Sequence, residues 1–248
     1  MKAVLLAGGL GTRMGELTRV LNKHLLPVGD KPMLFWPLEF LVDHDLKQIL
    51  VVVGEKGCGE VMRQVGDGSR FGAKVYYAFQ KGEGGIAAAL SLAEDWVQGE
   101  PVVVVLGDGI FSPQPQLKHL VHSWKNFATQ GAVVFLWPVD QHADQFGIAE
   151  CLRDGFVNKI VEKPKGYKAG LVVTGLYLYD QTVFSRIRCI QPSKRGELEI
   201  TDVNNDYAQQ GKLYYEKVRG RWIDCGTPEF YEQANRWARE RQMEEITV

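Results

Sequence analysis

Short apolar runs alternate with stretches of helical periodicity through the first half of the chain. The apolar, largely β-branched runs predict strands at residues 3–7, 49–53, 74–79, 102–106 and 132–139. Apolar residues at helical spacing predict helices between them, at residues 32–44, 58–65, 85–97 and 116–129. Asp30 and Pro32 would cap and open the first of these helices. Nearly continuous apolar strands separated by helices are typical of a parallel sheet with both faces covered.

The second half of the chain has a more mixed pattern. It predicts strands near residues 148–151, 157–162, 171–179 and 213–218, and helices at residues 199–210 and 228–243. No linker, repeat or low-complexity segment interrupts residues 1–248. We therefore expect a single α/β domain with a doubly wound, mostly parallel, Rossmann-like sheet, helices on both faces and a smaller substrate-binding elaboration.

Composition and charge exclude several classes of partner. With 29 basic and 30 acidic side chains, the formal net charge is −1, and there is no basic block. Neither nucleic acid nor an anionic membrane is therefore indicated. No stretch of about 18 apolar residues predicts a membrane span. The four cysteines form no CxxC pair, so we expect free thiols and a cytoplasmic location.

The strongest local signal is the glycine-rich loop at residues 6–13, LAGGLGTR, which follows the first predicted strand. Glycines at such a strand end let backbone N–H groups approach phosphate oxygens, and Arg13 adds a planar cation. The loop does not fit a Walker A motif, and the third glycine of a dinucleotide fingerprint is replaced by Met14. A tight turn without ligand is the alternative. Lys23 precedes an apolar run and is a second candidate cation for this site.

Two segments, LAGGLGTR at 6–13 and NKHLLPVGDKPM at 22–33, resemble the signature of the sugar-phosphate nucleotidyltransferases. Further matches follow in order at GGIA (84–87), LGD (106–108), FG (146–147), EKP (162–164), TGLY (174–177), RGELEITD (195–202) and WIDCGT (222–227). The chain is identified as a member of that family. Its chain end, soon after the 228–243 helix, is similar to the short form of the family, and a homo-oligomer is possible by analogy.

The resemblance implies that a sugar 1-phosphate attacks the α-phosphorus of a nucleoside triphosphate in line with departing pyrophosphate. It assigns Mg²⁺ to Asp108 and Asp224, and carboxylate oxygens are ligands that suit this cation. It places Arg13 at the β- and γ-phosphates, Lys23 near the α-phosphate and Lys163 at the sugar phosphate. It also divides the chain into a nucleotide-binding part at about 1–110, a sugar-binding part at about 111–227 and the C-terminal helix.

The remaining substrate contacts are likewise implied by the resemblance. Those to the nucleotide come from Leu6, Gly8, Gly9, Gly11, Thr12, Gln80 and Gly85, and those to the sugar and its phosphate come from Gly147, Glu162, Thr174 and Gly175. The Gln80 amide can donate and accept at once, as the imide edge of a pyrimidine requires. Thymine and uracil share that edge, so we expect dTTP to be preferred with some use of UTP.

The chain departs from the family pattern at two positions. Glucose-specific members usually carry Asn where this chain has Gly109, and Gln where it has Ala88. Glucose 1-phosphate is the expected acceptor, with another hexose 1-phosphate as the alternative. Two other functions stay open: a catalytically inactive sugar-nucleotide sensor, and a nicotinamide-dependent oxidoreductase that would use the glycine loop.

Overall fold

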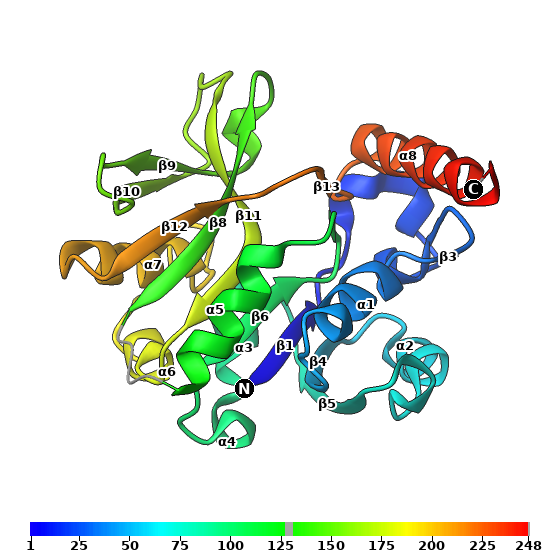
Figure 1. Ribbon diagram of the computed structural model, residues 1–248, viewed down its shortest axis with the longest axis horizontal. Coiled ribbons are helices and arrows are strands. Elements are labelled where there is room, and N and C mark those ends of the chain that lie inside the picture. Colours follow the sequence, from blue (N-terminus) through cyan, green and yellow to red (C-terminus); the bar gives the residue numbers. More distant parts are fainter. Residues whose placement is uncertain (127–130, 248) are drawn as a thin grey trace.

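The computed structural model describes residues 1–126 and 131–247. Its centre is a block of four parallel strands in the order β6-β1-β4-β5 (Figure 1). These strands are β1 (Lys2–Ala7), β4 (Gln48–Gly54), β5 (Lys74–Gln80) and β6 (Val102–Leu106). Their carboxyl ends meet at one edge of the sheet, which is where the loops of a parallel sheet bind ligands.

The second half of the chain extends the same sheet with antiparallel strands. Strand β11 pairs antiparallel with β6, β8 and β9, while β12 pairs parallel with β8. These strands are β8 (Ala132–Val139), β9 (Gly147–Cys151), β10 (Val157–Glu162), β11 (Gly170–Tyr179) and β12 (Leu213–Lys217). The predicted α/β class with a Rossmann-like parallel core is confirmed, and the nine-stranded sheet as a whole is mixed. Apolar runs predict strands but do not encode their direction.

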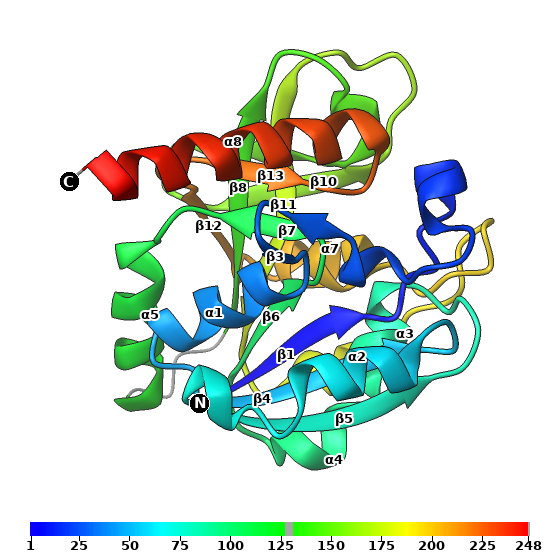
Figure 2. The same cartoon turned by 90° about the vertical axis from the view of Figure 1, so that its right-hand side faces the viewer.

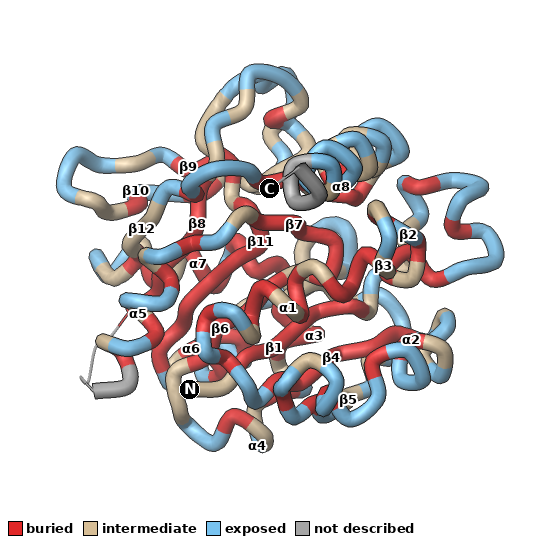
Figure 3. Tube along the Cα trace, turned by 45° about the vertical axis from the view of Figure 1, so that its right-hand side comes forward, coloured by how far each residue is buried: buried red, intermediate tan, exposed pale blue. Residues whose placement is uncertain are grey.

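Helices cover both faces of the sheet, as Figures 1 and 2 show. Ala3, Leu5 and Ala7 of β1 point to the core under α1 (Phe35–Asp43), α2 (Cys58–Val65) and α5 (Pro115–Asn126). Val4 and Leu6 point to the opposite core, under α3 (Ile86–Ser91), α4 (Glu94–Val97), α6 (Val183–Ile187) and α7 (Ile200–Gln209). Because both faces of β1 are buried, its sequence is apolar at every position but the first (Figure 3).

A third, smaller core lies under the last helix, α8 (Pro228–Thr247) (Figure 2). There Ala234 and Ala238 contact a layer made by β2 (Pro27–Val28), β13 (Trp222–Asp224), β7 (Gly109–Phe111) and the 3-10 segment Thr12–Thr18. Further short elements are β3 (Lys31–Pro32) and the 3-10 turns Lys23–Leu25, Ser69–Phe71 and Ala143–Gln145. No helix in the described part of the chain is long and apolar enough to cross a membrane.

Several predicted boundaries were wrong. Helix α1 begins at Phe35 with Leu34 as its N-cap, because Pro32 belongs to the small β2–β3 hairpin, so neither Asp30 nor Pro32 opens the helix. The predicted helix at 85–97 is two helices, α3 and α4, separated at residues 92–93. The end of the helix predicted at 116–129 lies outside the described residues. Strands β7 and β13 were not predicted, since three residues are too few for a periodicity.

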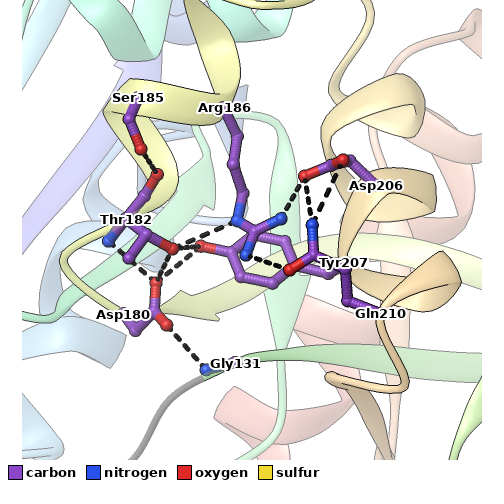
Figure 4. Close-up of polar contacts among 8 residues, drawn as sticks. All are labelled: Gly131, Asp180, Thr182, Ser185, Arg186, Asp206, Tyr207 and Gln210. Carbon is purple, nitrogen blue, oxygen red and sulfur yellow. Dashed lines mark hydrogen bonds and ion pairs between the residues drawn. The ribbon is translucent and has the colours of Figure 1, made fainter.

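A buried polar network ties the end of β11 to helices α6 and α7 (Figure 4). The Asp180 carboxylate, 2% exposed, accepts hydrogen bonds from the backbone N–H of Gly131 and Thr182, and from the hydroxyls of Thr182 and Tyr207. Arg186 of α6 stacks on the Tyr207 ring and pairs with Asp206 of α7. The network fixes α7, whose first residues, Ile200 and Thr201, line a cavity beside the sheet.

Candidate active site

Asp108 and Asp224 are brought together by the pairing of two short strands. Asp108 follows β6 and precedes β7, and β7 pairs antiparallel with β13, so that Gly109 lies opposite Asp224. The backbone N–H of Cys225 donates to the carbonyl of Asp108 at 2.9 Å. Both carboxylates line one cavity, together with Arg13. The Arg13 guanidinium and the Asp224 carboxylate both lie against Gly226. A β-carbon added to this glycine would be 2.6 Å from Arg13 Nη2 and 3.1 Å from both Asp224 carboxylate oxygens.

The two carboxylates have opposite electrostatic surroundings. Burial disfavours ionisation of Asp108, but the Lys23 ammonium and, more weakly, Arg13 outweigh it and lower its pKa to about 2. Burial, followed by repulsion from Asp108, raises the pKa of Asp224 to about 6. Two adjacent carboxylates of which one resists ionisation form a site that favours a cation between them.

The chemistry of this pair fits Mg²⁺ but not a cation held by protein alone. No group of three or more His, Cys, Asp or Glu side chains in the described ranges could enclose a metal ion. Mg²⁺ is commonly bound by one or two carboxylates, with the phosphates of a substrate and water completing its octahedron. Asp108 and Asp224 would supply those two carboxylates.

A second cavity adjoins the first and lies over the glycine loop. Its lining includes Leu6, Gly8, Gly9, Thr12, Arg13, Lys23, Gln80, Gly85 and Asp108. Gln80 reaches across from β5, and a β-carbon on Gly8 would collide with its Oε1. Gly11 lines neither cavity. Its φ is 71°, and a β-carbon added to it would lie 3.0 Å from Lys23 Cβ, which leaves little room for a side chain there.

The first cavity extends toward the antiparallel half of the sheet. There Gly147, Glu162, Lys163, Thr174 and Gly175 line it. The Thr174 hydroxyl is engaged inside the protein, since it donates to the carbonyl of Phe135 at 2.8 Å. Gly175 has a φ of 82°, and a β-carbon there would lie 2.6 Å from Leu106 Cδ1. A glycine is therefore required where β11 bulges at the cavity wall.

The structure thus gathers every predicted site residue except Gly11 around two adjoining cavities that share Arg13, Asp108 and Lys163. It also adds residues that the sequence did not single out. Among these are Phe146, Tyr177, Thr201 and Trp222, with Arg195 and Glu199 from the RGELEITD segment, to which no role was assigned. The signal for Trp222 was available, because residues two apart on a strand share a face and Trp222 precedes Asp224 by two.

Arg195 is held in a cage of carboxylates at the junction of the two cavities. Its guanidinium donates to Glu199 through three contacts of 2.8–3.1 Å and lies 3.3 Å from Glu197 and 3.6 Å from Glu162. Glu162 in turn accepts a hydrogen bond of 2.5 Å from the Thr201 hydroxyl and lies 3.5 Å from Lys163 Nζ. A cation and several acceptors are therefore fixed at one end of the cavity.

The fold and this site define a nucleotidyltransferase. A model of the nucleotidyl transferase family matches residues 2–241, and the chain belongs to that family.

Similar proteins narrow the class further. A glucose-1-phosphate thymidylyltransferase of Neisseria meningitidis is 38% identical over 237 residues, which are 94% of this chain and 81% of that protein. One from Xanthomonas campestris is 38% identical over 94% of this chain and 79% of its own length. A solved Bacillus anthracis structure, described as a glucose-1-phosphate thymidylyltransferase in complex with sucrose, is 43% identical in sequence and has a TM-score of 0.88. The match covers 96% of this chain and 95% of that one. A UDP-glucose pyrophosphorylase bound to UDP-glucose, 22% identical with a TM-score of 0.80, shares the fold.

Proposed function

We propose that the protein transfers dTMP from dTTP to glucose 1-phosphate, releasing pyrophosphate and forming dTDP-glucose. The observation that carries the proposal is the convergence of Asp108, Asp224 and Arg13 on one cavity between the glycine loop and the Glu162–Arg195 cluster. The names of the relatives that are 38–43% identical support the choice of substrates. The proposal divides the chain into a nucleotide-binding part at about 1–110 and a sugar-binding part at about 111–227.

The chemistry requires charge neutralisation and alignment more than proton transfer. A phosphate monoester has its second pKa near 6, so the sugar phosphate is mostly a dianion at neutral pH and needs no general base. The obstacle is the approach of two polyanions. Mg²⁺ held by Asp108 and Asp224 would neutralise charge on the reacting phosphates. Arg13 would stabilise the departing pyrophosphate, and Lys163 would hold the attacking phosphate at the shared part of the two cavities.

The two substrates would be recognised at opposite ends of the two adjoining cavities. Gln80 lies against Gly8 at the end of β5, where its amide can meet the imide edge of a pyrimidine. Glu162 and the backbone at Gly147 and Gly175 face the cavity at the other end, where sugar hydroxyls would be bound. A thymine methyl contributes only about 1–3 kcal/mol of discrimination, so UTP is expected as a slower substrate.

Gly109 bears on which sugar the cavity accepts. It lines the cavity beside Asp108, and a β-carbon on it would lie 2.9 Å from the ring of Phe111. The ring therefore occupies the space in which a polar side chain would begin. Another hexose 1-phosphate is consequently the second candidate acceptor.

A matrix of nucleoside triphosphates against sugar 1-phosphates, assayed for pyrophosphate release with Mg²⁺, tests the proposal. We expect dTTP with glucose 1-phosphate to be the fastest combination and UTP to be slower. A preference for ATP, GTP or CTP would contradict the nucleotide assignment. Pyrophosphate release without any sugar phosphate would indicate hydrolysis of the triphosphate in place of transfer. No release with any substrate pair would contradict transfer and favour the inactive sensor.

The cation assignment has its own test. Replacing Asp108 by Asn should lower kcat by about 10²-fold or more, since it removes a ligand and a charge at the reacting phosphates. Asp95→Asn, on the exposed side of α4, is the matched control and should retain turnover. Turnover of Asp108→Asn near that of the wild type would remove Asp108 from the proposed role.

A further inference from the structure

Lys23 and Asp108 form a buried ion pair inside the nucleotide cavity. Lys23 Nζ lies 2.5 Å from Asp108 Oδ2, and the two residues are only 7% and 9% exposed. An ion pair so shielded from water is weakly screened and therefore strong relative to surface pairs. Lys23 thus pairs with the same carboxylate that the proposed function assigns to Mg²⁺.

The backbone around Lys23 is held firmly by its neighbour Asn22. Asn22 caps the 3-10 turn Lys23–Leu25, because its Oδ1 accepts from the His24 N–H at 2.8 Å and its Nδ2 donates to the Lys56 carbonyl at 2.6 Å. The lysine stem runs beside Gly11 of the glycine loop. Side-chain rotation alone could therefore carry the ammonium from Asp108 to phosphates bound over that loop, since both places belong to one cavity.

The charges around the pair balance without any metal. Asp108 and Asp224 supply two negative charges, and Lys23 and Arg13 supply two positive ones. His24 adds none near neutral pH, because burial, helped by Lys23, holds its pKa at about 3. A divalent cation entering alone would stand beside an ammonium in a site already neutral. A triphosphate brings negative charge that compensates both.

We infer that Lys23 stands in for the divalent cation at Asp108, so that the cation binds tightly only together with the triphosphate, whose phosphates draw Lys23 away. The inference rests on the proposed function and adds to it a coupling between the binding of the cation and the binding of the nucleotide. Free Mg²⁺ binds weakly, and the cation and nucleotide strengthen each other's binding by the same factor, as linkage requires. Lys23 is in this respect a residue that sets the coupling between the two ligands.

Binding of Mn²⁺, followed by electron paramagnetic resonance, tests the inference without turnover. With the wild type we expect weak binding of Mn²⁺ alone and much tighter binding when a non-hydrolysable dTTP analogue is present. Lys23→Met should bind Mn²⁺ alone about tenfold tighter or more, and should lose most of the strengthening by nucleotide. Adding Asp108→Asn to Lys23→Met should abolish the tight binding, which places it at Asp108.

Two further variants separate the charge of Lys23 from other effects. Lys163→Met removes another lysine of the same cavity, one whose ammonium lies near Glu162, and should leave binding of Mn²⁺ alone unchanged. Lys23→Arg keeps the charge and should keep that binding weak. Lys23→Gln measures the same quantity as Lys23→Met if the methionine variant fails to fold, as judged by thermal unfolding.

The outcomes distinguish this inference from the proposed function. A folded, uncharged Lys23 variant that binds Mn²⁺ alone no more tightly than the wild type overturns the inference, even if the wild type turns over dTTP and glucose 1-phosphate. Absence of turnover with every substrate pair would overturn the proposed function. In that case the affinities of the variants for Mn²⁺, measured without nucleotide, would still decide whether Lys23 competes with the cation for Asp108.

Discussion

At the scale of single residues, the two carboxylates at the sheet edge show how one small site can hold opposite pKa shifts. The cationic neighbours of Asp108 lower its pKa, whereas burial and the negative charge of Asp108 raise the pKa of Asp224. The folded protein without a cation therefore holds a proton on Asp224 more tightly than the unfolded chain does. A carboxylate in such surroundings lowers the stability of the folded protein at pH values where it is ionised.

This arrangement predicts a pH-dependent gain in stability for Asp224→Asn in the presence of a chelator. The contribution of Asp224 protonation to stability is complete below its unfolded pKa of 3.8 and is lost as the pH rises through about 6. The variant should therefore be more stable than the wild type at pH 8, by about 3 kcal/mol for a shift of about two pKa units at roughly 1.4 kcal/mol per unit, and nearly equal to it near pH 4.

Urea unfolding with EDTA at both pH values measures the difference. Asp95→Asn, an exposed aspartate, should change stability little at either pH. Equal stability of wild type and Asp224→Asn at pH 8 would show that the Asp224 carboxylate carries no strain in the metal-free protein.

Gly8 gives a second prediction at the residue scale. A β-carbon there meets the far end of the Gln80 side chain, which is flexible, and so Gly8→Ala should fold with a stability change below about 1 kcal/mol. It should instead displace the Gln80 amide and raise KM for dTTP and UTP alike, because both bases present the imide edge that this amide would meet.

Steady-state kinetics with both triphosphates measures this effect. Gln80→Ala should reproduce it, because it removes the same amide without crowding the loop. An unchanged KM for both triphosphates in both variants would exclude Gln80 from base recognition.

At the scale of elements, the network around Asp180 holds helices α6 and α7 to the end of β11 (Figure 4). Helix α7 begins at Ile200, and the residues around its start, Glu199 and Thr201, line the sugar end of the cavity. The network thus supports the site from the far side of the helix.

We predict that Asp180→Asn lowers the free energy of unfolding by about 2–4 kcal/mol, since an amide cannot accept all four hydrogen bonds that the buried carboxylate accepts. Asp206→Asn is the matched control in the same network. Its side chain is 42% exposed, so its loss should cost less than about 1 kcal/mol. Chemical denaturation of both variants measures the contrast, and equal effects would mean that burial does not decide the strength of this network.

At the scale of the whole molecule, α8 joins the end of the chain to its beginning. The carboxylate at Asp224 and the loop carrying Arg13 both rest on the small core beneath this helix, through Ile223, Cys225 and Met14. Close approach is possible because Ala238 faces Gly29, where an added β-carbon would lie only 2.9 Å away.

Ala238→Leu should therefore destabilise the protein by about 1–3 kcal/mol through overpacking and lower kcat by shifting both catalytic segments. Thermal unfolding and initial rates measure the two effects. Arg239→Leu changes the exposed neighbour and should leave both nearly unchanged. Full stability and turnover in Ala238→Leu would show that α8 is not tightly coupled to the site.

The sequence by itself determined the α/β class, the strands of the parallel core and many of the residues that line the two cavities. Periodicity reports burial on one or both faces of an element, and the glycine loop, Asp108 and Lys163 each lie in a local motif. These features depend on near neighbours in the chain, and so a linear pattern records them.

Only the tertiary structure decided how those residues meet. The antiparallel direction of β11, the β7–β13 pairing that sets Asp224 beside Asp108, and the ion pair between Lys23 and Asp108 all join residues that lie far apart in the sequence. Contacts at such separations depend on the packing of the whole chain. The balance of charge in the site, and hence the inferred coupling of cation and nucleotide, belongs to that packing.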